Sequence, residues 1–496
     1  MKIPSEANDR RRLVRDTYVP AMDLRPLIDG EFVDTGGGRS LAIVDPTLGT
    51  TLVEMPLGGR GEADAALSAA RHAFDSGPWP QMAPVERAER LERLSALIEN
   101  RLEELALLEA ADVGKPVAGV RSWDIPNAAE VYRFYAQLAR DRKPTRLGKA
   151  SGFAITDEPS PVGVCVAIVP WNFPFPNISW KVAPALAAGC TVVVKPAERA
   201  PLSAQLLAQL VVECDFPPGV FNIVMGIGEE VGAALVTDRR TDKVTFTGSA
   251  ETGREIARLS ATHLPRLTLE LGGKNPNVVM ADADLDAALP GTVDAFFAVA
   301  GQNCCAGSRT LVEAAIFEEF TERLVELAAA RVLGDPLDDA TEQGPQIDAE
   351  HLRRIESYVE AALEGGARRV TKREEFERGF FFSPTILTDL DPGAPIAREE
   401  VFGPVGCLLP FADKEEAIAM ANDTEFGLSA SLWTSETDFA ERFAQAARVG
   451  TCWINSFGLF ETVAPWGGTK GSGFGRELGS RGLEPFLNPK TVYRPE

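Results

Sequence analysis

Short apolar runs alternate with helical stretches between residues 162 and 247, and this pattern constrains the fold more than any other feature of the sequence. Runs typical of fully buried strands occur at residues 162–169, 190–195, 220–225 and 243–247. Helical patterns separate them at residues 180–188, 201–213 and 229–236. Buried strands that alternate with helices form βαβ units around a parallel sheet. We therefore predict an α/β fold with a doubly wound, Rossmann-like sheet, an architecture that can bind a nucleotide.

The flanking segments extend this α/β pattern. Residues 27–32 have the pattern of a short hairpin, residues 62–74 that of a helix, and residues 85–113 that of one long helix. A second α/β region follows from about residue 271, with helices expected at 284–300, 317–330 and 349–363 and a strand at 407–411. The tail after Glu477 ends in an extended stretch, and we expect it to be an arm that packs on another surface, such as a second subunit.

Composition excludes several classes of function. The formal net charge of −22 argues against a nucleic-acid partner or an anionic membrane surface, and leaves a small molecule as the expected partner. Seven cysteines at irregular spacing, without a CxxC pair, are typical of a reduced, cytoplasmic chain, and three histidines are too few for a His-rich metal centre. Residues 159–180 carry no charge, but five prolines there argue against a membrane span.

Cys304 is the first candidate for chemistry. It lies in the glycine- and amide-rich segment GQNCCAG, residues 301–307, after a predicted helix. A thiolate is a strong nucleophile, and backbone N–H groups near a helix end lower the thiol pKa from about 8.5. The competing interpretation is a pair of small core cysteines, because free cysteines are usually buried.

Two polar residues at the ends of predicted strands are further candidates. Glu270 is costly to bury as an anion, so it either pairs with a cation such as Lys274 or has a raised pKa and acts as a base. Asn172 follows the first strand of the sheet and can donate to a developing oxyanion, although a turn asparagine is the commoner role.

Other strand ends have features of a nucleotide site. Lys195 can meet a phosphate or a ribose hydroxyl, and Glu198 can accept hydrogen bonds from a ribose diol, whereas the alternative is a surface Lys–Glu pair. Gly228 with Gly232, and Gly248 with Ser249, follow strands and precede helices, which suits a pyrophosphate at a helix N-terminus. Neither glycine motif is specific by itself.

Taken together, these motifs resemble the NAD(P)-dependent aldehyde dehydrogenase superfamily over nearly the whole chain. The matching segments are PWNFP (170–174), KPAE (195–198), FTGS (246–249), LELGGK (269–274), GQNCCAGSR (301–309), EEVFGPV (399–405) and PWGGTKGSGFGRELG (465–479). The resemblance implies oxidation of an aldehyde to a carboxylate through a thiohemiacetal and a thioester on Cys304. It further implies that Glu270 activates water and that Asn172 holds the oxyanion, without a metal.

The resemblance also implies a cofactor site. The matching residues are Ile168, Pro170, Trp171, Lys195, Glu198, Gly228, Gly232, Phe246, Gly248, Ser249, Leu271, Glu400 and Phe402. Lys195 and Glu198 match contacts to the adenosine ribose, and Glu400 matches a contact to the nicotinamide ribose. NAD is the expected cofactor, because Glu198 would repel the 2′-phosphate of the alternative, NADP. Cys305 matches a variable neighbour of the nucleophile and receives no role.

Aromatic residues dominate the positions that match the aldehyde site. They are Trp123, Phe173, Asn177, Trp180, Phe460 and Trp466, of which Asn177 alone is not aromatic. Asp124 and Glu461 are close to them in sequence, so we hypothesise a preference for cationic aldehydes through cation–π and charge attraction. Residues 119–140 and the PWGG segment also resemble those of enzymes that act on amino- and betaine-type aldehydes. The competing interpretation of the two acids is ordinary solvated surface.

The resemblance implies a division of the chain as well. The cofactor domain comprises residues 8–140 and 162–271, the catalytic domain residues 272–474, and the oligomerisation elements residues 141–161 and 475–496. A homodimer or homotetramer follows from these elements. Three rival functions stay open: a CoA-acylating aldehyde dehydrogenase, a cysteine hydrolase, and a structural protein that kept the fold.

Overall fold

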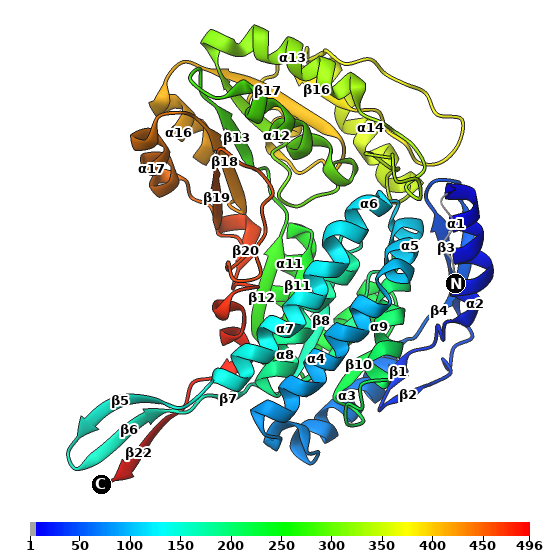
Figure 1. Ribbon diagram of the computed structural model, residues 1–496, viewed down its shortest axis with the longest axis vertical. Helices are drawn as coiled ribbons and strands as arrows, with labels where there is room; N and C mark the ends of the chain where they lie inside the picture. The colour runs from blue at the N-terminus through cyan, green and yellow to red at the C-terminus, as the bar shows by residue number, and fades with distance from the viewer. Residues whose placement is uncertain (1–5) are drawn as a thin grey trace.

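Two sheets of mostly parallel strands, each covered by helices, make up most of the molecule, and a narrow three-stranded arm projects from one end (Figure 1). The computed structural model describes residues 6–496. The α/β fold class predicted from the sequence is confirmed.

The first sheet has eight strands in the order β2-β1-β10-β9-β8-β11-β12-β20. Their bounds are β1 Leu27–Ile28, β2 Glu31–Phe32, β8 Val164–Ile168, β9 Thr191–Lys195, β10 Phe221–Ile223, β11 Lys243–Gly248, β12 Arg266–Leu271 and β20 Gly473–Phe474. The strands from β8 to β12 are parallel, and the chain order reverses direction between the neighbours β8 and β11. Each of the four predicted buried strands therefore exists, with bounds that differ from the prediction by at most two residues.

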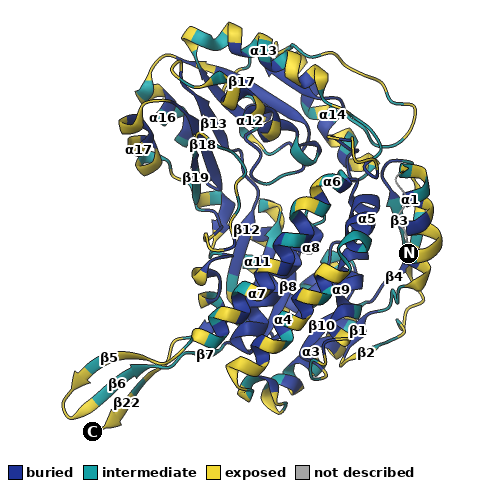
Figure 2. Ribbon diagram, in the orientation of Figure 1, coloured by how far each residue is buried: buried dark blue, intermediate teal, exposed yellow. Residues whose placement is uncertain are grey.

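Residues of this sheet alternate between two helical layers, as the two-residue period of a strand requires. Cys165 and Ala167 of β8 pack with the layer of α4, α5, α7, α8 and α9, whereas Val164 and Val166 pack with α3, α10 and α11. The helices span α3 Arg60–Asp75, α4 Pro84–Asn100, α5 Leu102–Val113, α7 Ile125–Asp141, α8 Pro174–Ala188, α9 Leu202–Val212, α10 Ala233–Thr237 and α11 Ala250–Ser260. Buried strands between two helical layers explain the continuous apolar runs in the sequence (Figure 2).

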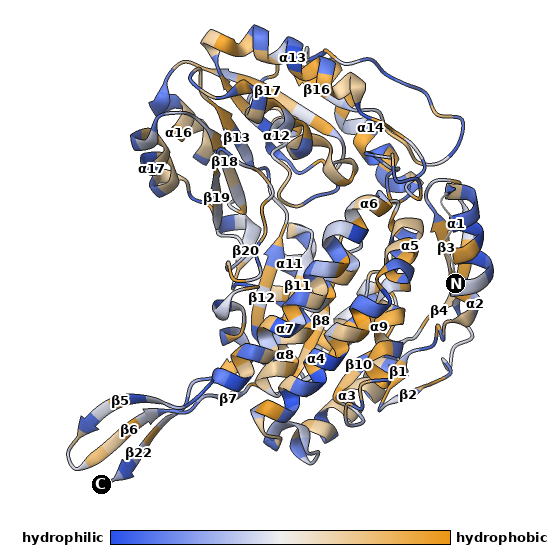
Figure 3. Ribbon diagram, in the orientation of Figure 1, coloured by the Kyte–Doolittle hydropathy of each residue, from blue (hydrophilic) through white to orange (hydrophobic). Residues whose placement is uncertain are grey.

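The second sheet has seven strands in the order β15-β16-β17-β14-β13-β18-β19. Its strands are β13 Pro276–Val279, β14 Arg309–Glu313, β15 Arg368–Arg369, β16 Thr385–Thr388, β17 Val405–Phe411, β18 Ser429–Trp433 and β19 Thr451–Ile454. Helices α12 Leu285–Phe297, α13 Phe317–Ala330, α14 Ala349–Glu364, α15 Pro395–Arg398, α16 Lys414–Asn422 and α17 Thr437–Ala446 cover it. The strands of both sheets are hydrophobic, whereas the outer helices carry hydrophilic faces (Figure 3).

The remaining strands lie outside the two large sheets. β5 Thr145–Ala150, β6 Phe153–Asp157 and β22 Thr491–Pro495 form the projecting arm, in the order β22-β6-β5. The short pair β7 Ser160–Pro161 and β21 Leu487–Asn488 lies at its base, and β3 Ser40–Asp45 pairs with β4 Thr50–Pro56. Three short helices complete the chain: α1 Ala7–Leu13, α2 Val19–Ala21 and α6 Val117–Gly119. The extended tail predicted at 491–493 thus pairs with its own chain.

Four predicted helical stretches differ clearly from the observed helices. The helix predicted at 85–113 is two helices, because Arg101 leaves helical geometry (φ −107°, ψ 16°) between α4 and α5. The helix predicted at 180–188 begins earlier, at Pro174. Proline is tolerated in the first turn of a helix, because the backbone N–H that it lacks would have no partner within the helix there. The helix at 284–300 ends at Phe297, and the stretch 229–236 opens with a wider turn before α10.

None of the helices within residues 6–496 combines the length and the apolar character that crossing a bilayer requires.

Candidate active site

A cavity of about 1250 Å³ lies where the two sheets meet. The chain leaves β12 at Leu271 and enters β13 at Pro276, so the carboxyl ends of the first sheet face the amino ends of the second. The cavity also lies beside the reversal between β8 and β11, the position where doubly wound sheets bind ligands.

All the residues that the sequence assigned to catalysis, cofactor or aldehyde line this cavity. They are Trp123, Ile168, Pro170, Trp171, Asn172, Phe173, Asn177, Trp180, Lys195, Glu198, Gly228, Gly232, Phe246, Gly248, Ser249, Glu270, Leu271, Cys304, Glu400, Phe402, Phe460 and Trp466. The fold therefore brings the complete predicted set together, although the role of each residue is a separate question.

The loop between α12 and β14 carries Cys304. Val299 and Ala300 adopt left-handed backbone conformations, with φ of 53° and 55°. Gly301 follows with a φ of 72°, and a Cβ there would lie 2.0 Å from the carbonyl oxygen of Gly403. The loop therefore turns sharply against the β17 side of the second sheet, which places the cysteine at the cavity.

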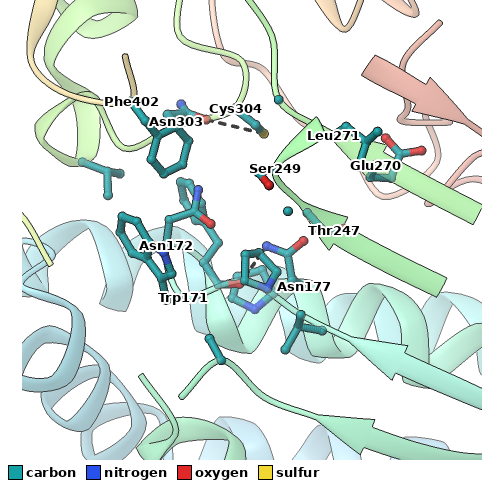
Figure 4. Close-up of a pocket in the computed structure, with 18 of the residues that line it drawn as sticks. Trp171, Asn172, Asn177, Thr247, Ser249, Glu270, Leu271, Asn303, Cys304 and Phe402 are labelled. Carbon is teal, nitrogen blue, oxygen red and sulfur yellow. Dashed lines mark hydrogen bonds between the residues drawn. The ribbon is translucent and has the colours of Figure 1, made fainter. Parts of the chain in front are cut away.

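Asn275 fixes the far side of this loop. Its Nδ2 donates to the carbonyl oxygens of Cys304, at 2.9 Å, and Ala306, at 3.1 Å. Asn172 holds the near side, since its Nδ2 donates to the carbonyl oxygen of Gln302 at 2.9 Å. The amide predicted to hold an oxyanion is thus buried beside the cysteine (Figure 4).

The Cys304 thiol is partly buried, whereas Cys305 is fully buried. Burial raises the pKa of the Cys304 thiol well above its ordinary value, and the neighbouring Cys305 and the carboxylates of Glu400 and Glu270 raise it further. A backbone N–H lowers this pKa, as the sequence suggested, but the desolvation of the thiol dominates, so the net shift of the pKa is upward.

Glu270, near the end of β12, is only 3% exposed. Within residues 6–496 neither of its carboxylate oxygens has a hydrogen-bond partner, and neither has the ammonium of Lys274, so the ion pair considered from the sequence is not formed. Burial raises the pKa of Glu270 well above its ordinary range, and the nearby Glu477 raises it further. A buried carboxyl with a raised pKa, whose oxygens have no hydrogen-bond partner among the described residues, suits a base rather than a structural ion pair.

The Glu270 side chain is turned away from the nucleophile. Figure 4 shows its carboxylate pointing away from Cys304. Gly467 provides the space that it occupies, because a Cβ at Gly467 would lie 2.6 Å from Glu270 Oε1. The glycine pair of the PWGG segment thus accommodates the carboxyl group in this position.

The opposite part of the cavity carries groups suited to a dinucleotide. Lys195 is buried, and its Nζ lies 2.9 Å from Glu198 Oε1, so the Lys–Glu pair exists but at the cavity rather than on the outer surface. A Cβ added to Gly228 or Gly232 would meet nothing closer than 3.6 Å, so packing does not require these glycines. Their missing side chains instead keep the space beside Lys195 open.

Helix α11 and Glu400 complete this part of the site. Ser249 caps α11 by accepting the Thr252 N–H at 3.1 Å, and the positive end of the helix borders the cavity. Glu400 Oε1 accepts the Gly273 N–H at 3.1 Å, and burial raises the pKa of Glu400 to about 7. Anion-binding and diol-binding groups therefore line one continuous space, which fits a dinucleotide.

Five aromatic side chains form what we term the aromatic box: Trp123, Phe173, Trp180, Phe460 and Trp466. The centroid of the Trp123 ring lies 6.0 Å from that of Phe173 and 5.7 Å from that of Phe460. Phe460 in turn lies 4.7 Å from Trp466 and 6.2 Å from Trp180. These edge and tilted contacts produce an apolar enclosure, as expected for an organic side chain.

The polar residues near the box contribute less than the sequence suggested. Asn177 Nδ2 donates to the Phe173 carbonyl at 2.9 Å, within its own helix turn. Asp124 lines the cavity, but it forms an ion pair with Lys115. Glu461 is exposed and lies outside the cavity lining. The proposed attraction of a cation by these two carboxylates therefore loses its structural support.

Several residues at the site had no role in the sequence analysis. Lys181 Nζ lies 2.6 Å from Glu477 Oε1 and donates to Thr247 Oγ1 at 2.6 Å. A lysine inside an otherwise apolar helix was the signal that could have identified this buried pair. His351 Nε2 lies 2.7 Å from the Phe402 carbonyl oxygen, and no motif pointed to it. Within the described part of the chain, no group of three or more His, Cys, Asp or Glu side chains could hold a metal ion.

A cysteine, a buried glutamate and a large cavity at the reversal point of a doubly wound sheet are typical of a cysteine-dependent enzyme that binds a dinucleotide. Residues 32–492 match the model of the aldehyde dehydrogenase family. The chain belongs to this family, as its sequence motifs indicated.

Individual relatives support this assignment. Betaine aldehyde dehydrogenase of Bacillus subtilis is 43% identical over 477 residues, which cover 94% of this chain and 96% of the relative. Human mitochondrial aldehyde dehydrogenase is 41% identical over 484 residues, which cover 96% of this chain and 94% of the relative. A crystal structure of Staphylococcus aureus betaine aldehyde dehydrogenase in complex with NAD+ superposes with a TM-score of 0.94 at 37% identity, covering 96% of this chain and 95% of that one.

Proposed function

We propose that this enzyme oxidises an aldehyde to a carboxylate with NAD+, through a covalent thioester on Cys304. One observation carries the proposal: the Cys304 thiol, the Asn172 amide and the Glu270 carboxyl border one cavity at the reversal point of a doubly wound sheet. The NAD+ complex of a structural relative supports the choice of cofactor.

In the first step, Cys304 forms a covalent bond with the aldehyde. The Cys304 thiol first releases its proton to solvent, and the thiolate then attacks the aldehyde carbon, so that a C–S bond forms and the carbonyl π electrons move to the oxygen. The Asn172 amide and the Cys304 backbone N–H then stabilise that oxyanion, a type of contact worth about 3–4 kcal/mol. Bound NAD+ supplies the acceptor for the hydride lost from the aldehyde carbon.

In the second step, Glu270 accepts a proton from water. Its carboxylate removes one proton from water as the water oxygen attacks the thioester, and the C–S bond breaks with its electrons on the sulfur. The acid that is released passes its remaining proton to solvent, which yields the carboxylate product and the Cys304 thiolate. Because the side chain points away from the sulfur, it must rotate toward Cys304 before it can act. Its lack of hydrogen-bond partners within residues 6–496 lowers the cost of that rotation.

Cys304→Ala tests the proposal. We expect NADH formation to disappear, because no covalent intermediate forms, whereas Cys305→Ala retains turnover as the matched control for a cysteine that is fully buried. Both variants are assayed by absorbance of NADH with a panel of aldehydes. Full turnover in Cys304→Ala would refute the role of this thiol.

The preferred cofactor is NAD, because Glu198 borders the cavity where a 2′-phosphate would meet its charge. The ratio of kcat/KM for NAD+ and NADP+ measures this preference, and we expect Glu198→Gln to shift the ratio toward NADP+ at least tenfold. A wild-type preference for NADP+ would overturn the assignment.

The aromatic box supports a bulky apolar or onium side chain on the aldehyde, because ring faces bind both hydrocarbon and cations. The names of the betaine aldehyde dehydrogenase relatives favour the onium alternative. Betaine aldehyde and 3,3-dimethylbutanal have nearly the same shape and differ in charge, so their kcat/KM ratio reports cation recognition alone. A ratio above about 10 would support an onium substrate, and a ratio below 1 would exclude it.

Two rivals have less support. A CoA-acylating enzyme would not need a base for hydrolysis, and detection of acyl-CoA in place of free acid would identify it. A cysteine hydrolase needs a base such as histidine beside the thiol, but His351 contacts the Phe402 carbonyl instead. A cytoplasmic location remains our expectation from composition.

A further inference from the structure

Three buried charged residues form a cluster behind the aromatic box: Glu109 of α5, Lys115 of the following loop, and Asp124 immediately before α7. Lys115 Nζ contacts Asp124 Oδ2 and lies 3.7 Å from Glu109 Oε1. The side chains of all three are at most 4% exposed. Groups this deeply buried interact through a medium of low dielectric, so their charges are felt by neighbouring ligands.

The cluster reaches the substrate space directly. Lys115 and Asp124 both line the cavity, and Asp124 follows Trp123 of the aromatic box in sequence. Lys115 Nζ lies 3.6 Å from the centroid of the Phe173 ring. One ring of the box therefore already binds a cation that belongs to the protein, and that ammonium would repel a second cation.

The net charge of the cluster depends on Glu109. Its Oε2 accepts the Phe175 N–H at 3.2 Å, at the start of α8. Burial raises the pKa of Glu109 to about 8, and the carboxylate of Asp124 contributes to the rise. With Glu109 protonated, the Lys115–Asp124 ion pair leaves the cluster without net charge.

We propose that Lys115 is a specificity-determining residue, because its ammonium cancels the charge of Asp124 at the wall of the aromatic box and thereby limits the preference of the site for cationic aldehydes. The inference rests on the proposed aldehyde oxidation. It concerns the kind of aldehyde, whereas the chemistry on Cys304 is unaffected by it.

Removal of the ammonium tests the proposal. Lys115→Met leaves the carboxylate of Asp124 uncompensated, so we expect the kcat/KM ratio of betaine aldehyde to 3,3-dimethylbutanal to rise about tenfold or more. Lys115→Met/Asp124→Asn removes both charges, and we expect its ratio to return to within about twofold of the wild-type value. If Lys115 had a purely structural role, the substitution would lower kcat/KM for both aldehydes by the same factor and leave their ratio unchanged.

A buried carboxylate without its partner destabilises a protein, so a second variant is needed if Lys115→Met does not fold. Lys115→Gln also removes the ammonium, but its amide N–H groups can still donate to Asp124 Oδ2, so the carboxylate keeps a hydrogen-bond donor. Its ratio should rise as well.

The outcomes separate the two proposals. An unchanged ratio in a folded, active variant that lacks Lys115 overturns the inference, and so does a ratio that stays raised when Asp124 is also replaced. Failure of the wild-type protein to oxidise either aldehyde, or any other in a panel, would instead contradict the proposed function.

Discussion

At the scale of single residues, the site depends on charged groups that the fold buries without full compensation. Glu270 has no hydrogen-bond partner within residues 6–496 and faces Gly467. Glu477, in contrast, forms an ion pair with Lys181, whose Nζ lies 2.6 Å from Glu477 Oε1. Two carboxyl groups of the same cavity therefore have opposite environments. The proposed role of base therefore falls on Glu270, the carboxyl group without a hydrogen-bond partner among the described residues.

Glu270→Gln should separate acylation from hydrolysis. The raised pKa of Glu270 keeps it protonated at low pH, so the rate of thioester hydrolysis rises with pH as the carboxylate forms. The glutamine cannot remove a proton, and we expect a burst of NADH followed by slow turnover whose pH dependence is flat. Stopped-flow absorbance from pH 6 to 9 measures both phases; steady turnover at the wild-type rate across this range would contradict the role.

The same substitution should stabilise the protein at alkaline pH. Because the folded-state pKa of Glu270 is raised, its contribution to stability is complete below the unfolded-state pKa and is lost as pH rises toward the folded-state pKa. Glutamine has no charge to lose, so we expect the free energy of unfolding of Glu270→Gln to exceed that of wild type at pH 8 and to match it near pH 4. Denaturant titrations measure the difference, and exposed Glu322→Gln serves as the control.

At the scale of elements, the strand ends supply the chemistry. Asn172 and Lys195 each stand at or just after a strand that the apolar runs identified, whereas Glu270 lies in β12, which is not one of the four runs. The sequence therefore predicted most of the sheet and part of its polar edge. The loop before Cys304 could not be predicted in the same way. Left-handed Val299 and Ala300 persist because contacts far apart in the sequence, such as that between Gly301 and Gly403, enforce them.

The charge balance of the site could not be predicted from local sequence patterns either. The sequence placed Asp124 near the aldehyde, but the ion pair with Lys115 that compensates it depends on how α5 packs beside α7. The direction of the Glu270 side chain similarly depends on Gly467, almost two hundred residues away in the chain. Motifs therefore identified which residues meet, whereas side-chain direction and charge balance required the three-dimensional packing.

Gly301→Ala should disable the cysteine loop. The added Cβ would lie 2.0 Å from the Gly403 carbonyl oxygen, and the φ of 72° is unfavourable for alanine, so the loop must move. We expect kcat/KM to fall at least about a hundredfold, since small displacements of reacting groups have effects of this size. Gly366→Ala is the matched control, because its φ of 98° is equally unfavourable but its Cβ meets no atom within 4 Å. Equal activity of the two variants would contradict the prediction.

At the scale of the whole molecule, the arm is the part that the single chain does not explain. Its three strands project away from both large sheets (Figure 1), and within residues 6–496 neither outer edge, β5 or β22, pairs with a further strand. Unpaired edges invite association, and natural proteins normally protect them. We therefore propose that the arm, within the elements 141–161 and 475–496, joins this chain to other copies of itself.

The side chains of the arm give this proposal a test. Leu147, Phe153 and Tyr493 are 58%, 38% and 60% exposed, which is unfavourable unless another subunit covers them. Replacing all three with serine removes the apolar contact area but leaves the backbone pairing of β22 with β6 and of β6 with β5 in place. We expect the variant to fall from a dimer or tetramer to a monomer of 53.4 kDa in light scattering, while Leu264→Ser, at an 82% exposed site outside the arm, keeps the wild-type mass. The cavity is built from one chain, so a monomeric variant that still forms NADH would show that the arm assembles the enzyme without completing its active site. An unchanged mass would mean that the interface between subunits lies elsewhere.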